Sequence, residues 1–167
     1  MSRAFVKEGD GEVVLPERAI SPHPNLVTAS GLAQIDAQVR ELEAARSAAR
    51  QAARSGAGNP DVAALAAIER DLRYWVQRKA SARLVTTAPA PQVARFGVSV
   101  TLRDETGATR TLCIVGEDEA DPARGLVSWV SPAAEALIGA RVGDEVRLAG
   151  KGFEIMQLTV DPGAGRA

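Results

Sequence analysis

The sequence predicts an α+β protein, in which an antiparallel helical hairpin precedes a twisted antiparallel β-sheet with one short helix. Three observations support this prediction. Apolar residues before position 85 recur every three or four positions, as they do along the seam of a coiled coil. A stretch rich in alanine and proline, 88–91, then interrupts the chain. Short apolar runs separated by turn residues follow it, which is typical of a small sheet.

The first segment, 1–25, is expected to form an extended arm. It contains Pro16, Pro22 and Pro24 and has no sustained periodicity. The only histidine of the chain, His23, lies between two of these prolines, and there is no second histidine with which to build a metal site. We therefore interpret His23 as a surface loop residue.

Residues 26–88 are expected to form the coiled-coil hairpin. Thr28 or Ser30 can cap the first helix, and a strong turn signal at 55–60 ends it. Asp61 then opens the second helix. The predicted seam residues are Leu32, Ile35, Val39, Leu42, Ala45 and Ala49 in the first helix and Leu65, Ile68, Leu72, Trp75 and Lys79 in the second. Two helices of about 25 residues would project roughly 35–40 Å.

Residues 96–161 are expected to form the sheet domain, after a linker at 89–95 and before a tail at 162–167. The predicted strands are 96–102, 109–115, 126–130, 145–149 and 153–160. One helix, 132–138, interrupts them. Ser131 is a good N-cap for this helix, Pro132 suits its first position, and Gly139 suits its end.

Composition narrows the class of protein. The single cysteine, Cys113, excludes an intramolecular disulfide and lies in an apolar run, as expected of a buried strand residue. No apolar segment is long enough to span a membrane, and the first residues lack the apolar core of a signal peptide. We therefore expect a cytoplasmic protein. Residues 25–85 carry nine basic against six acidic side chains, whereas residues 96–161 carry six against eleven. This asymmetry suggests two modules with different surfaces, or ordinary solvated faces.

Several motifs occur in a specific order. They are Phe-Gly at 96–97, the run Ile-Val-Gly-Glu-Asp-Glu-Ala-Asp at 114–121, Ser-Pro-Ala at 131–133 with Ala-Leu-Ile-Gly at 136–139, Val-Gly-Asp at 142–144 and Phe-Glu-Ile at 153–155. In this order and spacing they resemble the C-terminal domain of the Gre family of bacterial transcription elongation factors. The segments 72–74 and 82–85 look like the GreB-like end of the second helix, and Thr28, Gly31 and Leu32 look like the family's entry into the first helix. The resemblance covers about 27–158 and implies an FKBP-like C-terminal fold. The arm before Val27 is an extension relative to the typical family member.

The resemblance also implies a function. Gre factors dock their C-terminal domain on the RNA polymerase core, at the rim of its secondary channel, and insert the coiled coil towards the active site and the nascent RNA. Two acidic side chains at the tip then help to hold a second magnesium ion in the polymerase active site for two-metal hydrolysis of backtracked RNA. We therefore expect a monomeric accessory factor that is not itself an enzyme and has no cofactor or metal of its own.

The tip of the hairpin departs from the family pattern. The family has a Gly-Asp start and a Glu-Asn pair in this loop, whereas residues 52–61 contain one carboxylate, that of Asp61. Glu43 and Glu69 lie too far along the helices to share a metal ion with it. Asp61 is either a helix N-cap or a lone carboxylate directed at a metal. Two functions stay open: stimulation of transcript cleavage in paused or backtracked complexes, or a channel binder that inhibits or tunes polymerase without cleavage.

Two further groups of residues are candidates for partner contact. Arginines of the hairpin can meet RNA phosphates or the channel wall, or they can be solubilising helix formers that pair with Glu69 or Asp71. These arginines are Arg46, Arg50, Arg54, Arg70, Arg73 and Arg78. The candidates for docking on polymerase are Ser131, Pro132, Ala133, Ile138 and Gly139, whereas Leu137 is expected in the core. The acidic run 117–121 can cap a helix or bind a cation weakly, but we interpret it as a solvated turn.

Two other classes are weighed against this function. A peptidyl-prolyl isomerase would share the FKBP-like fold, but it needs an apolar pocket lined by aromatic rings. Between residues 96 and 167 the aromatic residues are Phe96, Trp129 and Phe153. An interaction module that regulates a metabolic enzyme would combine such a domain with a short coiled coil. The hairpin predicted here is close to full length, which argues against that class.

Overall fold

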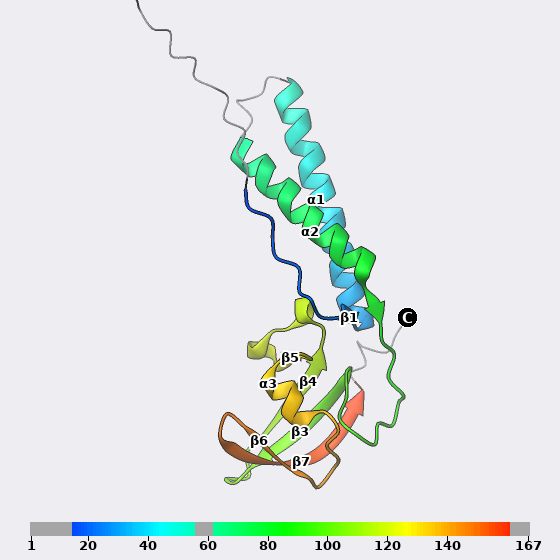
Figure 1. The fold of residues 1–167 in the computed structure, drawn as a ribbon, viewed down its shortest axis with the longest axis vertical. Helices are drawn as coiled ribbons and strands as arrows, with labels where there is room; N and C mark the ends of the chain where they lie inside the picture. Colours follow the sequence, from blue (N-terminus) through cyan, green and yellow to red (C-terminus); the bar gives the residue numbers. More distant parts are fainter. Residues whose placement is uncertain (1–14, 56–61, 161–167) are drawn as a thin grey trace, which may run out of the picture.

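The computed structural model describes residues 15–55 and 62–160. A long helical hairpin projects from one end of a small sheet domain (Figure 1). Its helices are α1, Ala29–Ser55, and α2, Val62–Ser81, and they pack side by side. The third helix, α3, Pro132–Leu137, packs against the sheet. The predicted α+β architecture, a helical hairpin followed by a sheet with one short helix, is therefore confirmed.

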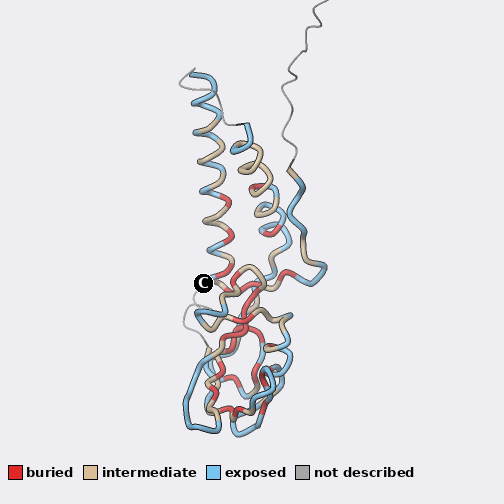
Figure 2. The backbone as a smooth tube through the Cα atoms, turned by 90° about the vertical axis from the view of Figure 1, so that its left-hand side faces the viewer, coloured by how far each residue is buried: buried red, intermediate tan, exposed pale blue. Residues whose placement is uncertain are grey.

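The hairpin is buried mainly near its base. Helix α1 buries Gly31, Ile35 and Val39, and helix α2 buries Leu72. The backbone at the outer end of the hairpin is half-buried or exposed (Figure 2), because two helices alone cannot cover each other's faces. Lys79, which was predicted on the seam, is exposed. Its Nζ instead pairs with the Asp36 carboxylate at 2.7 Å and so links the two helices.

A short parallel pair closes the base of the hairpin. Strand β1, Leu26–Val27, lies beside β2, Arg83–Leu84. The Arg83 amide donates to the carbonyl of Asn25 at 2.8 Å, and the Val85 amide donates to that of Val27 at 3.0 Å. Two-residue strands carry no periodicity, and the sequence therefore did not predict this pair.

The main sheet has five strands in the order β5-β4-β3-β7-β6. They are β3 (Val98–Asp104), β4 (Thr109–Val115), β5 (Leu126–Ser128), β6 (Glu145–Leu148) and β7 (Lys151–Val160). All neighbours are antiparallel except β4 and β5, which run parallel, so the sheet is mainly antiparallel, as predicted, and mixed at this edge. The 3-10 helices Glu117–Glu119 and Pro122–Arg124 lie between these two strands and allow the chain to return in the same direction.

The core of this domain lies between the sheet and α3. The central strand β3 alternates, with Val98, Val100 and Leu102 completely buried, as expected of a strand with one face on a core. Leu137 of α3 is completely buried against them, and Cys113 is buried in β4. The Ser131 hydroxyl caps α3 by accepting from the Ala134 amide at 3.2 Å. The predicted cap and core positions of this helix are therefore confirmed.

Residues 15–25 contain no helix or strand and run along the hairpin towards the sheet domain (Figure 1). Among the described residues, no helix is both long and apolar enough to cross a bilayer.

Candidate functional site

The acidic run 117–121 joins the sheet domain to the hairpin. Glu119 is 7% exposed, and its Oε2 accepts from the backbone amides of Thr28 at 3.1 Å and Gly116 at 3.2 Å. The hydroxyls of Thr28 and Ser30 donate to Oε1. The carboxylate therefore satisfies donors at the start of α1, where a negative charge is also favoured by the helix dipole. The interpretation of this run as a solvated turn is wrong, because distant parts of the chain supply its partners.

The second acidic residue of the run, Asp118, binds α2. Arg78 is 2% exposed, and its Nε donates to Asp118 Oδ2 at 2.5 Å. The Tyr74 hydroxyl donates to the other oxygen of Asp118 at 2.6 Å. Burial, together with this hydrogen bond, raises the pKa of Tyr74 to about 12. Arg78 was a candidate for RNA contact, but this assignment is wrong, because its guanidinium is buried and is paired with the half-buried Asp118 carboxylate.

Three of the predicted arginines share one shallow groove on the hairpin. The groove has a volume of about 360 Å³ and is lined by Glu43, Arg46, Arg50, Glu69, Leu72, Arg73 and Val76. Arg50 pairs with Glu69 at 2.7 Å, and Arg73 pairs with Glu17 of the arm at 2.6 Å. We call this feature the arginine groove.

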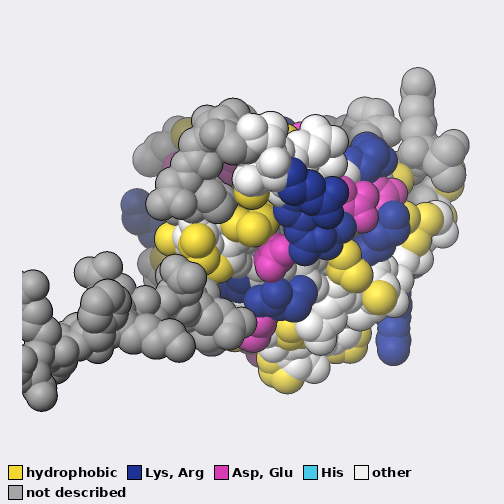
Figure 3. All heavy atoms as spheres, turned by 90° about the horizontal axis from the view of Figure 1, so that it is seen from above, with side chains coloured by type: hydrophobic (Ala, Val, Ile, Leu, Met, Phe, Trp, Pro, Cys, Tyr) yellow, Lys and Arg dark blue, Asp and Glu magenta, His cyan; other side chains and the backbone are white. Residues whose placement is uncertain are grey.

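The two remaining arginines lie outside the groove. Arg70 pairs with the neighbouring Asp71 at 2.8 Å, and Arg54 is exposed near the end of α1. Seen from the hairpin end, basic and acidic side chains alternate, and they form no continuous basic face (Figure 3). Asp61 and the turn 56–61 lie outside the described residues. Within the described part, no cluster of three His, Cys, Asp or Glu side chains is placed to hold a metal ion.

An apolar hollow lies beside α3. It has a volume of about 310 Å³ and is lined by His23, Trp129, Val130, Glu135 and Ile138. Ile138 is 46% exposed, and the His23 ring meets that of Trp129 edge-on, with 6.0 Å between the centroids. Among the described residues, no acceptor is found for the buried Trp129 Nε1–H. The hollow therefore offers apolar surface to a partner, whereas the Trp129 Nε1–H is buried beneath it.

The predicted docking residues divide between two surfaces. Ile138 lines the apolar hollow, and Gly139 follows it. Pro132 and Ala133 line a separate groove of about 520 Å³, which is flanked by Arg110 and Arg147. Ser131 is half-buried and caps α3.

Two residues of the hollow, Trp129 and Val130, were missed as candidates because they were assigned to a strand at 126–130. Strand β5 ends at Ser128, and the next two side chains are thereby left to line the hollow. Ser131 and Pro132, which favour the start of a helix, directly follow Val130. This is the sequence signal that indicates an earlier end of the strand.

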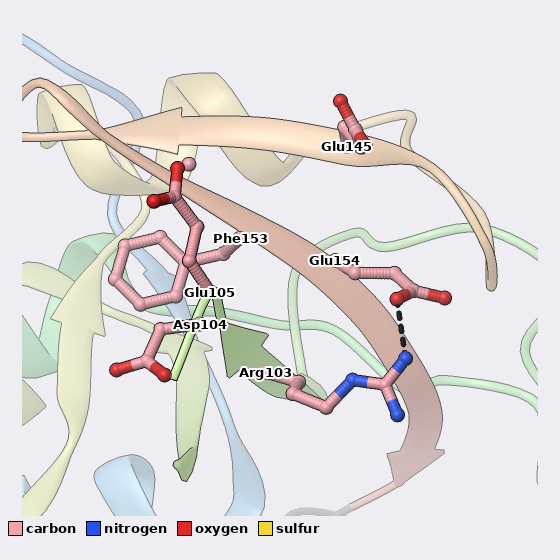
Figure 4. Close-up of a pocket in the computed structure, with 7 residues that line it drawn as sticks. Arg103, Asp104, Glu105, Glu145, Phe153 and Glu154 are labelled. Atoms are coloured by element: carbon pink, nitrogen blue, oxygen red, sulfur yellow. Dashed lines mark hydrogen bonds and ion pairs between the residues drawn. The ribbon is translucent and has the colours of Figure 1, made fainter. Parts of the chain in front are cut away.

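A fourth cavity, of about 180 Å³, is lined by residues of β3, β6 and β7 and of the turn after β3 (Figure 4). Its lining contains four carboxylates and one aromatic ring, that of Phe153. Arg103 is already paired there with Glu154 at 2.6 Å. Asp104 accepts from the amide and hydroxyl of Thr106, and this hydroxyl holds the pKa of Asp104 below its ordinary value. The cavity is therefore unlike the apolar, aromatic-lined pocket that a peptidyl-prolyl isomerase needs.

Comparison with known proteins identifies the sheet domain. Residues 88–160 match the family model described as transcription elongation factor, GreA/GreB, C-terminal. Residues 88–160, called the Gre domain below, are therefore similar to the C-terminal domain of the GreA/GreB family. The chain is 41% identical over 83 residues to transcription elongation factor GreB of Neisseria meningitidis serogroup B, an alignment covering 48% of this chain and 51% of the relative. It is 45% identical over 83 residues to transcription elongation factor GreA of Jannaschia sp., covering 47% and 53%. The chain thus spans about half the length of the curated relatives that it matches.

Among solved structures, GreA factor homolog 1 (Gfh1) of Thermus thermophilus is similar over 81% of this chain and 99% of its own, with 20% identity and a TM-score of 0.38. At these values nothing about function follows from the likeness.

Proposed function

We propose that this protein is a transcription elongation factor that binds the RNA polymerase core, with the Gre domain as its docking end. The match of residues 88–160 to the GreA/GreB C-terminal family carries this proposal. The apolar hollow supports it, because an exposed isoleucine beside a half-buried tryptophan offers a docking surface. In this proposal the protein is a monomeric cytoplasmic accessory factor, and the polymerase performs the chemistry.

The hairpin is proposed to enter the secondary channel of polymerase. Helix α1 has 27 residues and is therefore about 40 Å long. This length suits a hairpin that extends from the rim of the channel towards the polymerase active site. The arginine groove supports contact with the channel wall or with nascent RNA, because Arg46, Arg50 and Arg73 meet there. Ser131, Pro132, Ala133, Ile138 and Gly139 are proposed to touch the rim, with Trp129 and Val130 beside them.

A binding experiment tests the docking end. Ile138→Glu places a charge in the apolar hollow at an exposed position, where the fold tolerates it, and should weaken binding to core polymerase at least tenfold in co-sedimentation or fluorescence titration. Val142→Glu is the matched control, because Val142 is 59% exposed in the same domain and does not line the hollow. Failure of the wild-type protein to bind core enzyme at micromolar concentration would sink the proposal.

A second candidate function is polymerase binding without transcript cleavage. The single carboxylate in the tip sequence, Asp61, favours it, since a second metal ion needs more than one ligand from the tip. Cleavage of a backtracked ternary complex separates the two functions. If the wild-type protein cleaves and Asp61→Ala does not, Asp61 is directed at the metal. If the wild-type protein leaves the RNA intact while competing with an authentic cleavage factor, the second candidate is correct.

A further inference from the structure

Part of the N-terminal arm packs against helix α2 of the hairpin. We call residues 15–25 the strap. Glu17 receives two hydrogen bonds from Arg73, from Nε at 2.9 Å and from Nη2 at 2.6 Å. The guanidinium of Arg18 lies 3.8 Å from the centre of the Tyr74 ring and pairs with Asp71 at 3.8 Å. Two successive side chains of the strap therefore hold it against α2.

The two ends of the strap are held with different strength. At its inner end, Asn25 is buried and donates to the Arg78 carbonyl at 2.7 Å, beside the β1–β2 pair. At its outer end, the side chains of Arg73 and Glu17 are 56% and 63% exposed. Exposed ion pairs are weak and are screened by salt. The outer end can therefore lift from α2 while the inner end stays in place.

The counter-ions in the arginine groove come from different parts of the chain. Arg50 is neutralised by Glu69, which belongs to α2 itself and cannot leave the groove. Arg73 is neutralised by Glu17, which belongs to the strap. For Arg46, no ion pair is found within the described ranges. Lifting the strap would thus expose a second unneutralised guanidinium in the same groove.

We propose that Glu17 of the strap competes with the phosphate groups of single-stranded RNA for Arg73. The strap is then a built-in regulator of the arginine groove, which binds RNA more weakly while the strap is closed. This inference rests on the proposed role of the groove in contacting RNA. The physical basis is exchange of one anion for another at Arg73, since a phosphate oxygen accepts from a guanidinium in the same two-pronged geometry as a carboxylate.

The test is binding of a fluorescein-labelled single-stranded RNA to the full chain, followed by anisotropy at several salt concentrations. Glu17→Gln keeps the size of the side chain and removes its charge. It should tighten binding about two- to fivefold at low salt, the range of an exposed ion pair. It should also steepen the slope of log affinity against log salt by about 0.7, as expected for one additional phosphate contact to a single strand.

Two comparisons distinguish competition between Glu17 and RNA phosphate for Arg73 from the general effect of removing one negative charge from the protein. Glu41→Gln removes a carboxylate from the exposed side of α1, outside the groove, and should change RNA affinity less than Glu17→Gln. In an Arg73→Ala background, Glu17→Gln should have no effect, because the contested cation is absent. An equal gain with and without Arg73, or equal affinities of Glu17→Gln and wild type, would overturn the strap proposal.

A further variant distinguishes failure of the strap from failure of the groove. If Arg46→Ala weakens RNA binding while Glu17→Gln has no effect, the groove contacts RNA and the strap does not regulate it. If neither wild type nor any variant binds RNA while the protein still binds core polymerase, the RNA-contacting role and the strap proposal both fall, and polymerase binding stands.

Discussion

Replacing Gly31 with alanine tests how tightly the hairpin is joined to the sheet domain. A Cβ atom at this position would lie 2.1 Å from Cδ and 2.3 Å from Oε2 of Glu119. These atoms cannot easily move aside, because the carboxylate accepts from the amides of Thr28 and Gly116 and from two hydroxyls. The alanine methyl group must therefore displace Glu119 from its buried position.

The expected cost follows from the two backbone hydrogen bonds that are lost. A hydrogen bond to a charged group contributes about 1.5–3 kcal/mol. Alanine offsets about 0.5–1 kcal/mol of this loss, because glycine is unfavourable within a helix. Gly31→Ala should therefore lower the free energy of unfolding by about 2–5 kcal/mol.

Urea unfolding provides the measurement. Far-ultraviolet circular dichroism follows the helices, and fluorescence of Trp129 in a Trp75→Phe background follows the sheet domain. The decisive control is Glu119→Ala, which removes the atoms that clash. In that background, Gly31→Ala should stabilise the protein by about 0.5–1 kcal/mol, as in an ordinary helix. If Gly31→Ala alone is neutral or stabilising, or remains equally destabilising without Glu119, the reasoning is refuted.

Three further predictions concern the same fold. The absorbance titration of Tyr74 should have its midpoint near pH 12, and Asp118→Asn should lower it. Because the folded-state pKa is raised, the associated stability is complete below about pH 10, the ordinary tyrosine value, and is lost as pH rises towards 12. Arg78→Ala should lower the free energy of unfolding in urea by about 3–5 kcal/mol, since it removes a buried guanidinium and leaves the half-buried Asp118 carboxylate without its cation; an unchanged value would contradict the pairing of Arg78 with Asp118. Leu137→Ala should cost about 2–5 kcal/mol in the same assay through the cavity that it leaves, and a loss below 1 kcal/mol would mean that α3 is not part of the core.

The elements with strong local signals were predictable from the sequence. Helix α3 begins at a capping serine followed by proline. In the strands, apolar and polar residues alternate, and turn residues flank each run. Each of these elements is therefore encoded within about ten neighbouring positions. The outer part of the hairpin seam was less predictable. Periodicity indicates which face of a helix is apolar, but the depth of burial depends on how many neighbours the folded chain supplies.

The contacts of the acidic run could not be predicted in this way. Glu119 meets Thr28 across 91 positions of the chain, and Asp118 meets Arg78 across 40. No local pattern distinguishes a carboxylate that will be buried by a distant helix from one that stays in water. The same limitation hid the strap, because the ion pair between Glu17 and Arg73 joins residues 56 positions apart.

The junction at the base of α1 also determines where the far end of the hairpin can go. A helix about 40 Å long acts as a lever, and a rotation of about 5° at its base moves its end by about 3.5 Å. That displacement exceeds the length of a hydrogen bond, and it would separate any side chain at the end from a ligand that it had reached. The direction of the hairpin relative to the sheet domain is therefore set at its base by Glu119 and Asp118, at the opposite end of α1 from Ser55.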